Sequence, residues 1–240
     1  ITRVFYIAIT KKMHFKFRPN FSGHRFAKVF TTGLLSFIVE SEDAFVMAIL
    51  NLLLFHLAGE MGVNVMAMNT KVYMFLFVLI LGFAYGMETV VAYNHGAKKP
   101  DRVEKSVKVT LILSLGAGIL TTVIFYYYAE PLLGFFVEDQ HLIERCVPTF
   151  RRMIIGLPLL AFYYTGVMYL QAMGKALAST ILTLLRQIAI LLPLSLIFVY
   201  VLNVNLDNLF FAYPLTDLIA ALISIILLRK YLAQEKNALK

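Results

Sequence analysis

The most regular feature of this sequence is the spacing of its apolar residues. Six long apolar stretches, separated by short polar gaps, cover most of the 240 residues. They are residues 30–57, 62–93, 107–129, 147–173, 177–203 and 207–229. Because about 20 apolar residues in a helix cross the hydrocarbon core of a bilayer, each stretch is long enough to span a membrane. The pattern predicts an all-α integral membrane protein with a bundle of six transmembrane helices.

The charges in the gaps alternate along the chain. The basic gaps are 10–29, 94–108, 174–177 and 230–240. The gaps between them, which are acidic or lack Lys and Arg, are 57–62, 130–146 and 203–207. Since basic loops lie on the cytoplasmic side, this pattern predicts a multi-pass protein of the cytoplasmic (inner) membrane with both ends of the chain cytoplasmic. Arg151 and Arg152, at the outer end of the fourth stretch, depart from the pattern.

Composition supports a membrane protein independently. The chain is 60% apolar and 15% charged, with a mean hydropathy of +0.78, which a soluble protein would not have. The net charge of +8 is concentrated in the basic gaps, where it orients the chain and meets anionic membrane lipid, so we expect no nucleic-acid partner. The lone Cys146 excludes an internal disulfide and a cysteine-based metal cluster.

The start of the chain resembles the end of another helix. The apolar run 1–9 leads directly into a basic segment, so we interpret 1–29 as the end of a preceding helix and a cytoplasmic loop between two lobes. Residues 30–229 would then form the six-helix lobe, and 230–240 a cytoplasmic tail. Many transporters contain two repeated bundles, which makes a missing N-terminal lobe the expected partner.

Signals for an enzyme are weak. The five histidines are scattered over loops and the ends of stretches, and no two have metal-ligand spacing on one helix face. The sequence has no nucleophile elbow, phosphate loop or Cys–His pair. We therefore predict no catalytic residue, no metal and no cofactor other than a coupling ion.

Three acidic residues lie in the middle of the first stretch, where a charge costs about 2.5–3.5 kcal/mol on insertion scales. They are Glu40, Glu42 and Asp43. Glu40 and Asp43 share a helix face, whereas Glu42 points to nearly the opposite side. The first two would repel each other and favour a shared proton or a bound cation. The alternative is that they form ion pairs with a neighbouring helix.

Other ionisable residues also lie within the stretches. Arg186 and Asp217 fall near mid-depth in consecutive stretches, and we predict an ion pair between them that is structural rather than transporting. Glu88, near the inner end of the second stretch, is a further candidate for binding substrate or ion, although it is also close to the interface.

Helix-bending residues occur in the last three stretches. Pro158, Pro193 and Pro214 each remove a helical hydrogen bond and predict bends suited to alternating access, although prolines are common in membrane helices generally. Gly82 and Gly86 form a Gly-x-x-x-Gly pattern that is typical of close helix packing.

One motif resembles a known family. Tyr93, Asn94, Gly96 and Ala97 form a Tyr-Asn-x-Gly-Ala run before the basic loop 98–103, and the run resembles the second helix of the C-terminal lobe in multidrug and toxin extrusion (MATE) transporters, closest to the bacterial and archaeal multidrug subgroup. Three further segments resemble the same family in the right order: 171–175, 185–194 and 212–217. The resemblance covers about residues 28–230.

The resemblance implies a cation-coupled antiporter, using Na⁺ or H⁺, that exports organic cations and drugs by alternating access. Such proteins have twelve helices in two lobes, and this chain would be the C-terminal half. Glu88 departs from the family pattern, which often has Gln there. Some members couple through an acid in the helix matching 147–173, which has none here, and others through the N-terminal lobe. Others use the helix matching 30–57, which makes Glu40, Glu42 and Asp43 the candidates in this chain.

Two other classes of function remain open at this stage. A lipid-linked oligosaccharide flippase has the same broad architecture but needs a cationic cavity for pyrophosphate, whereas the mid-depth charges here are mainly acidic. A non-transporting membrane assembly subunit would tolerate loss of those acids.

Overall fold

The structure is a computed structural model that describes residues 23–238. The chain forms two units, Ile1–Phe37 and Ile38–Lys240. In the first unit the described residues are helical and expose Phe26 and Phe30, which stack on each other. Helix already begins at Gly23, earlier than the predicted start near residue 30. The apolar run 1–9 and most of the basic segment after it lie outside the described residues.

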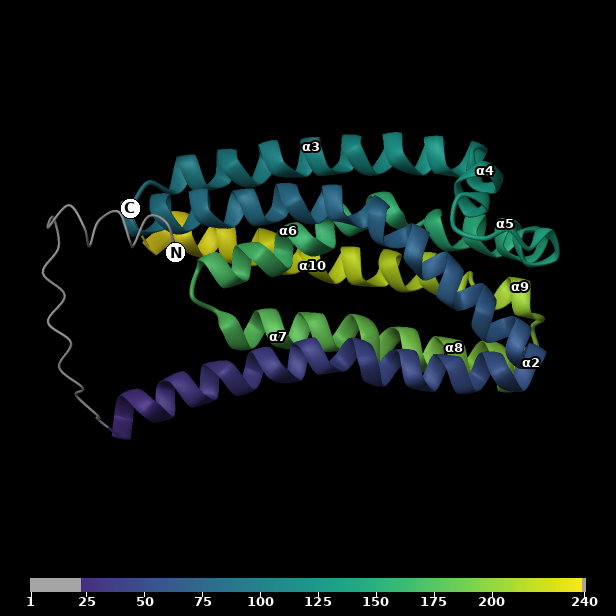
Figure 1. The fold of residues 1–240 in the computed structure, drawn as a ribbon. Coiled ribbons are helices and arrows are strands. Elements are labelled where there is room, and N and C mark those ends of the chain that lie inside the picture. The colour runs from purple at the N-terminus through teal and green to yellow at the C-terminus, as the bar shows by residue number, and fades with distance from the viewer. Residues whose placement is uncertain (1–22, 239–240) are drawn as a thin grey trace, which may run out of the picture. The chain divides into compact units, whose positions relative to one another are not determined.

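The part of the chain that the structure describes is built from helices and the turns between them (Figure 1). The α-helices are α2 (Gly23–Gly96), α3 (Pro100–Tyr127), α4 (Ala129–Gly134), α5 (Gln140–Ile154), α6 (Leu160–Ala172), α7 (Ala176–Leu184), α8 (Leu192–Tyr200), α9 (Leu206–Leu209) and α10 (Ala212–Ala238). A 3-10 turn, η1 (Leu157–Leu159), joins α5 to α6, and a π-helical segment, η2 (Leu185–Leu191), joins α7 to α8.

These elements make the predicted apolar spans. Five helical segments are long and apolar enough to cross a membrane: Phe37–Gly96, Pro100–Tyr127, Gln140–Ala172, Ala176–Tyr200 and Leu206–Lys236. The first has 60 residues and contains two predicted spans, because α2 is sharply kinked at Ala58 and Gly59. Gly59 has a φ of 61°, a conformation that glycine adopts without strain. The all-α membrane fold is therefore confirmed, with six spans once the kink is counted.

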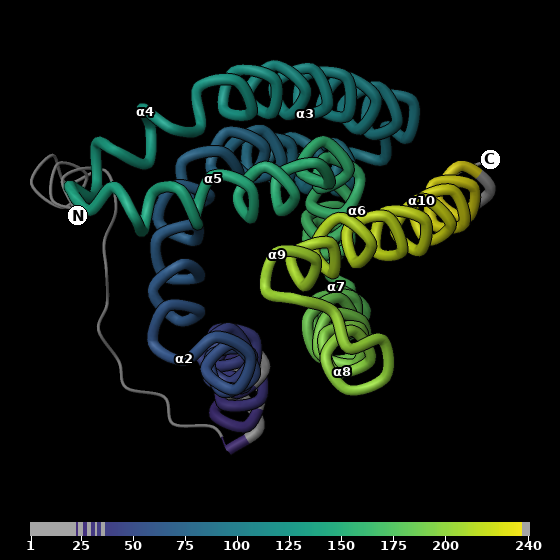
Figure 2. Tube along the Cα trace, turned by 90° about the vertical axis from the view of Figure 1, so that its right-hand side faces the viewer, coloured from purple at the N-terminus to yellow at the C-terminus, as the bar shows by residue number. Residues whose placement is uncertain are grey.

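The fourth span is the central one. In its apolar window 72% of residues are buried, against 22–39% in the other four segments. Figure 2, which views the bundle end-on, shows α3, α7 and α10 arranged around α6. This span is longer than predicted, because α5 begins at Gln140, inside the expected outer gap 130–146. Asp139 caps α5 by accepting hydrogen bonds from the backbone N–H groups of His141 and Leu142.

Prolines interrupt two of the three spans in which bends were predicted. Pro158 lies in η1, and Pro193 follows the π-helical segment η2. Pro214 does not bend its helix, because it is the third residue of α10. The N–H groups in the first turn of a helix have no partner within the helix, so proline costs no hydrogen bond there. The bend expected there lies just before it, in the turn between α9 and α10.

Two of the segments that resemble the family form the same helix-ending turn. At the end of α2, Lys98 N–H donates to His95 O (2.9 Å) and Lys99 N–H to Asn94 O (2.9 Å). After α6, Gly174 N–H donates to Gln171 O (2.9 Å) and Lys175 N–H to Leu170 O (2.8 Å).

Both turns are Schellman caps with one residue in the left-handed region, Lys98 (φ 54°) or Gly174 (φ 70°). The Tyr-Asn-x-Gly-Ala run therefore includes the C-terminal cap of α2, in which Asn94 is buried, whereas Tyr93 is exposed.

Candidate functional site

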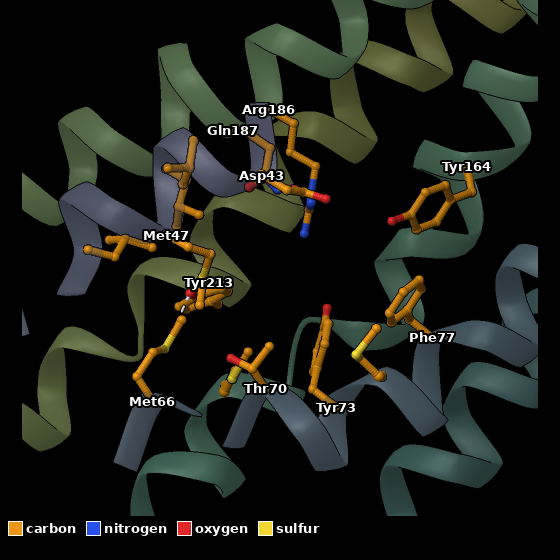
Figure 3. Close-up of a pocket in the computed structure, with 15 residues that line it drawn as sticks. Asp43, Met47, Met66, Thr70, Tyr73, Phe77, Tyr164, Arg186, Gln187 and Tyr213 are labelled. Atoms are coloured by element: carbon orange, nitrogen blue, oxygen red, sulfur yellow. Dashed lines mark hydrogen bonds between the residues drawn. The ribbon is translucent and has the colours of Figure 1, made fainter. Parts of the chain in front are cut away.

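A cavity of about 220 Å³ opens between the two halves of α2 and the segments η2, α6 and α10 (Figure 3). Its wall is mostly methionine and aromatic: Met47, Met66, Met74, Met153, Tyr73, Phe77, Tyr164 and Tyr213. Its polar residues are Asp43, Thr70, Arg186 and Gln187. The bundle thus gathers polar groups from distant parts of the sequence in one largely apolar chamber.

Asp43 is the carboxylate that opens into this cavity. It lies on the first half of α2, and its Oδ1 accepts a hydrogen bond of 2.6 Å from Gln187 Nε2 on η2. The side chain is otherwise exposed, and no lysine or arginine within residues 38–236 forms an ion pair with it. A neutral amide therefore holds the Asp43 carboxylate in place, and no ion pair within this part of the chain cancels its negative charge.

Arg186, the one cationic residue in the cavity wall as described, is neutralised by Asp217. Its Nε and Nη2 donate to Asp217 Oδ1 at 3.1 and 2.7 Å, and both side chains are buried. The guanidinium also lies 5.1 Å from the centre of the Tyr163 ring. The structure thus brings the predicted pair together, and with its charges cancelled the cavity retains the charge of Asp43.

The other predicted acids lie elsewhere. Glu40 is exposed and does not line the cavity, so the structure places only Asp43 of this predicted pair in the cavity wall. Glu42 is buried on the same helix stripe as Val46 and Leu50, and its Oε2 has no hydrogen-bond partner. Glu88 is half-buried and also lies outside this cavity.

Sequence reasoning missed most of the cavity wall. Gln187 and Tyr213 are predicted only as parts of the family-like segments 185–194 and 212–217, and Tyr73 and Tyr164 are not among the predicted site residues. A usable signal existed, since Tyr73, Tyr164 and Tyr213 place hydroxyl groups inside apolar spans, where each needs a polar neighbour or an aqueous cavity. The methionines carried no such signal, because Met also fills ordinary cores.

The two arginines that depart from the charge pattern both have an oxygen partner close by. Arg152 pairs with Asp207 at 3.2 Å, and Arg151 Nε donates to Tyr126 O (2.9 Å), a carbonyl in the last turn of α3. Such terminal carbonyls lack helical partners, so a cation here stabilises the helix end. These two residues therefore have a structural reason to lie at the acidic end of the bundle.

Comparison with solved structures identifies the fold. The chain superposes on a MATE transporter in complex with MaD3S with a TM-score of 0.87, at 19% identity, over 98% of this chain and 54% of that one. It also matches the outward-facing conformation of a multidrug resistance MATE family transporter of the MOP superfamily, with a TM-score of 0.84 at 19% identity, over 94% of this chain and 50% of the other. The fold is that of half of a multi-pass transporter.

Sequence comparison identifies the family. The profile of the MatE family matches residues 43–201, and the chain belongs to that family. Multidrug export protein MepA of Staphylococcus aureus (strain MSSA476) is 28% identical over 174 residues, which are 71% of this chain and 37% of MepA. The chain thus spans well under half of this curated relative. The MatE family is one of transporters and not of enzymes, as the sequence predicted.

Proposed function

We propose that this chain is the C-terminal lobe of a multidrug exporter that moves organic cations out across the cytoplasmic membrane by alternating access, coupled to Na⁺ or H⁺. Membership of the MatE family and the similarity to MepA support drug export. The similarity to both outward-facing and inward-facing transporter structures supports alternating access, since the inward-facing one also matches with a TM-score of 0.83. In this proposal the basic gaps and both ends of the chain face the cytoplasm.

The observation that carries the proposal is the uncompensated Asp43 carboxylate in a cavity of methionine and aromatic side chains. A lipophilic cation needs a surface for its apolar body and an electron-rich group for its charge. Aromatic faces and thioethers provide an apolar surface that accepts ligands of different shapes, and a carboxylate provides the negative charge. A flippase for a pyrophosphate-linked lipid would need an excess of positive charge here, and Arg186 is already paired.

The adjacent acids Glu42 and Asp43 provide a means of coupling. Asp43 is open to the cavity, whereas Glu42 is buried without a partner for Oε2, a position where an ionised carboxylate is costly. A proton or Na⁺ bound at these acids would reduce the negative potential that holds an organic cation. Ion binding and drug binding would then oppose each other, which is the linkage that an antiporter requires.

The test is efflux of ethidium by the full-length protein in cells. Asp43→Asn preserves the shape of the side chain and should abolish ion-driven efflux with unchanged expression. Glu40→Gln removes the same charge three residues away, outside the cavity, and should retain efflux. Normal efflux by Asp43→Asn, with unchanged pH and Na⁺ dependence, would refute the role of this acid and place the coupling site in the other lobe.

A further inference from the structure

A second hollow lies on a different face of the bundle. It is a groove of about 720 Å³ between the second half of α2 and the first half of α3, and none of its residues lines the cavity of Asp43. Its apolar part includes Gly82, Phe83, Gly86 and Val109, and its polar end includes Arg102 and Lys105.

Gly82 and Gly86 create the apolar part of the groove. The Gly-x-x-x-Gly pattern predicted close helix packing, but a Cβ added at either position would meet no atom outside the local backbone within 4 Å. The two glycines therefore do not bring helices together within the described part of the chain. They leave a strip of α2 without side chains, and the side chain of Phe83 beside it is exposed.

The cations at the polar end are available to a ligand. Arg102 and Lys105 are exposed, and neither forms an ion pair within residues 23–238. The neighbouring acids have other partners: Glu104 pairs with Lys108 at 2.6 Å and with Lys236 at 2.9 Å, and Asp101 lies 3.8 Å from Lys236. Both cations also lie in the first turns of α3, where the helix dipole favours an anion over a cation.

The groove has the length and polarity of one leaflet. From Gly82 to Asn94 a helix rises about 18 Å at 1.5 Å per residue, close to half of a hydrocarbon core of about 30 Å. The polar end coincides with the basic gap 94–108, which the charge pattern places at the membrane surface. We propose that this groove binds an acidic phospholipid, with its phosphate at Arg102 and Lys105 and an acyl chain along Gly82 and Gly86.

The test uses the full-length protein, stripped of lipid in detergent, with phosphatidylglycerol as the probe and phosphatidylcholine as the neutral comparison. Native mass spectrometry counts the bound lipids and gives their affinity. R102Q/K105Q should weaken phosphatidylglycerol binding about 30-fold, taking the usual contribution of a Lys or Arg at a membrane surface for each lost cation. G82L/G86L fills the apolar part and should remove the same bound lipid.

The matched control is K98Q/K99Q, which removes the same charge from the same basic gap but outside this groove, and it should leave the affinity unchanged. Retention of binding by both groove variants would overturn the proposal, as would an equal loss in the control, which would indicate general attraction to the basic surface. Displacement of the lipid by millimolar inorganic phosphate would show a site for free phosphate. Weaker binding of phosphatidylglycerol by both groove variants, with unchanged affinity in the control, supports the proposal, provided that the melting temperatures of the variants match that of the wild type.

Discussion

Arg186 directs two hydrogen bonds at a single oxygen of Asp217, and the other carboxylate oxygen, Oδ2, is buried without a partner. The pair joins η2 to α10, the last two spans. It is thus a buried contact between consecutive spans. Because its two charges cancel, the net charge of the cavity wall is that of Asp43.

We predict that either Arg186→Gln or Asp217→Asn alone destabilises the bundle by about 3–5 kcal/mol, because a buried charge loses its partner. The double variant should recover part of this loss. Thermal unfolding of the four proteins in detergent gives the coupling energy, and simple additivity would show that the pair is not energetically coupled.

A second prediction concerns Gly156, which lies in the turn between α5 and η1 and faces the start of α10. A Cβ on Gly156 would lie 2.5 Å from Pro214 Cα and 2.9 Å from Asp217 Oδ2. Gly156→Ala should therefore cost about 1–3 kcal/mol through overpacking. The control is Gly116→Ala on α3, where a Cβ meets nothing within 4 Å and should stabilise by about 0.5–1 kcal/mol through helix propensity. Equal effects of the two substitutions on the melting temperature would contradict the packing.

The two Schellman caps allow a prediction with opposite signs. Gly174→Ala places a Cβ in the left-handed region and should destabilise by about 1–2 kcal/mol, whereas Lys98→Gly removes one and should stabilise by up to about the same amount. The melting temperatures of the two variants should move in opposite directions. A decrease for Lys98→Gly would indicate that this side chain makes a contact worth more than its backbone strain.

Membrane orientation can be tested by cysteine labelling. Cys146 is buried, so it is replaced by Ser and single cysteines are introduced at the exposed positions Lys99 and Glu138. We expect an impermeant maleimide added to intact cells to label Glu138→Cys, whereas Lys99→Cys should react only after permeabilisation. Labelling in the reverse order would invert the proposed orientation.

The spans could be predicted from sequence because membrane crossing needs only length and apolarity, and the Arg186–Asp217 pair because two isolated charges at equal depth have few other partners. The rotation of the first span could not be predicted. Apolar residues lie on every face of this helix, so nothing in the sequence shows that Glu42 lies on the packed stripe and that Asp43 faces the cavity. The sequence does not distinguish a groove at Gly82 and Gly86 from a helix contact, because small residues permit close packing without requiring it.

The π-helical segment η2 changes the direction of the side chains in the middle of its span relative to those of the flanking helices. An α-helix completes the same stretch with one residue fewer, so η2 is equivalent to an α-helix with one inserted residue. The extra residue lies between α7 and α8, in the segment that carries Arg186 and Gln187, so it sets the direction in which these two side chains leave the span. A one-residue insertion or deletion within η2 would therefore change the direction in which side chains of this span enter the cavity.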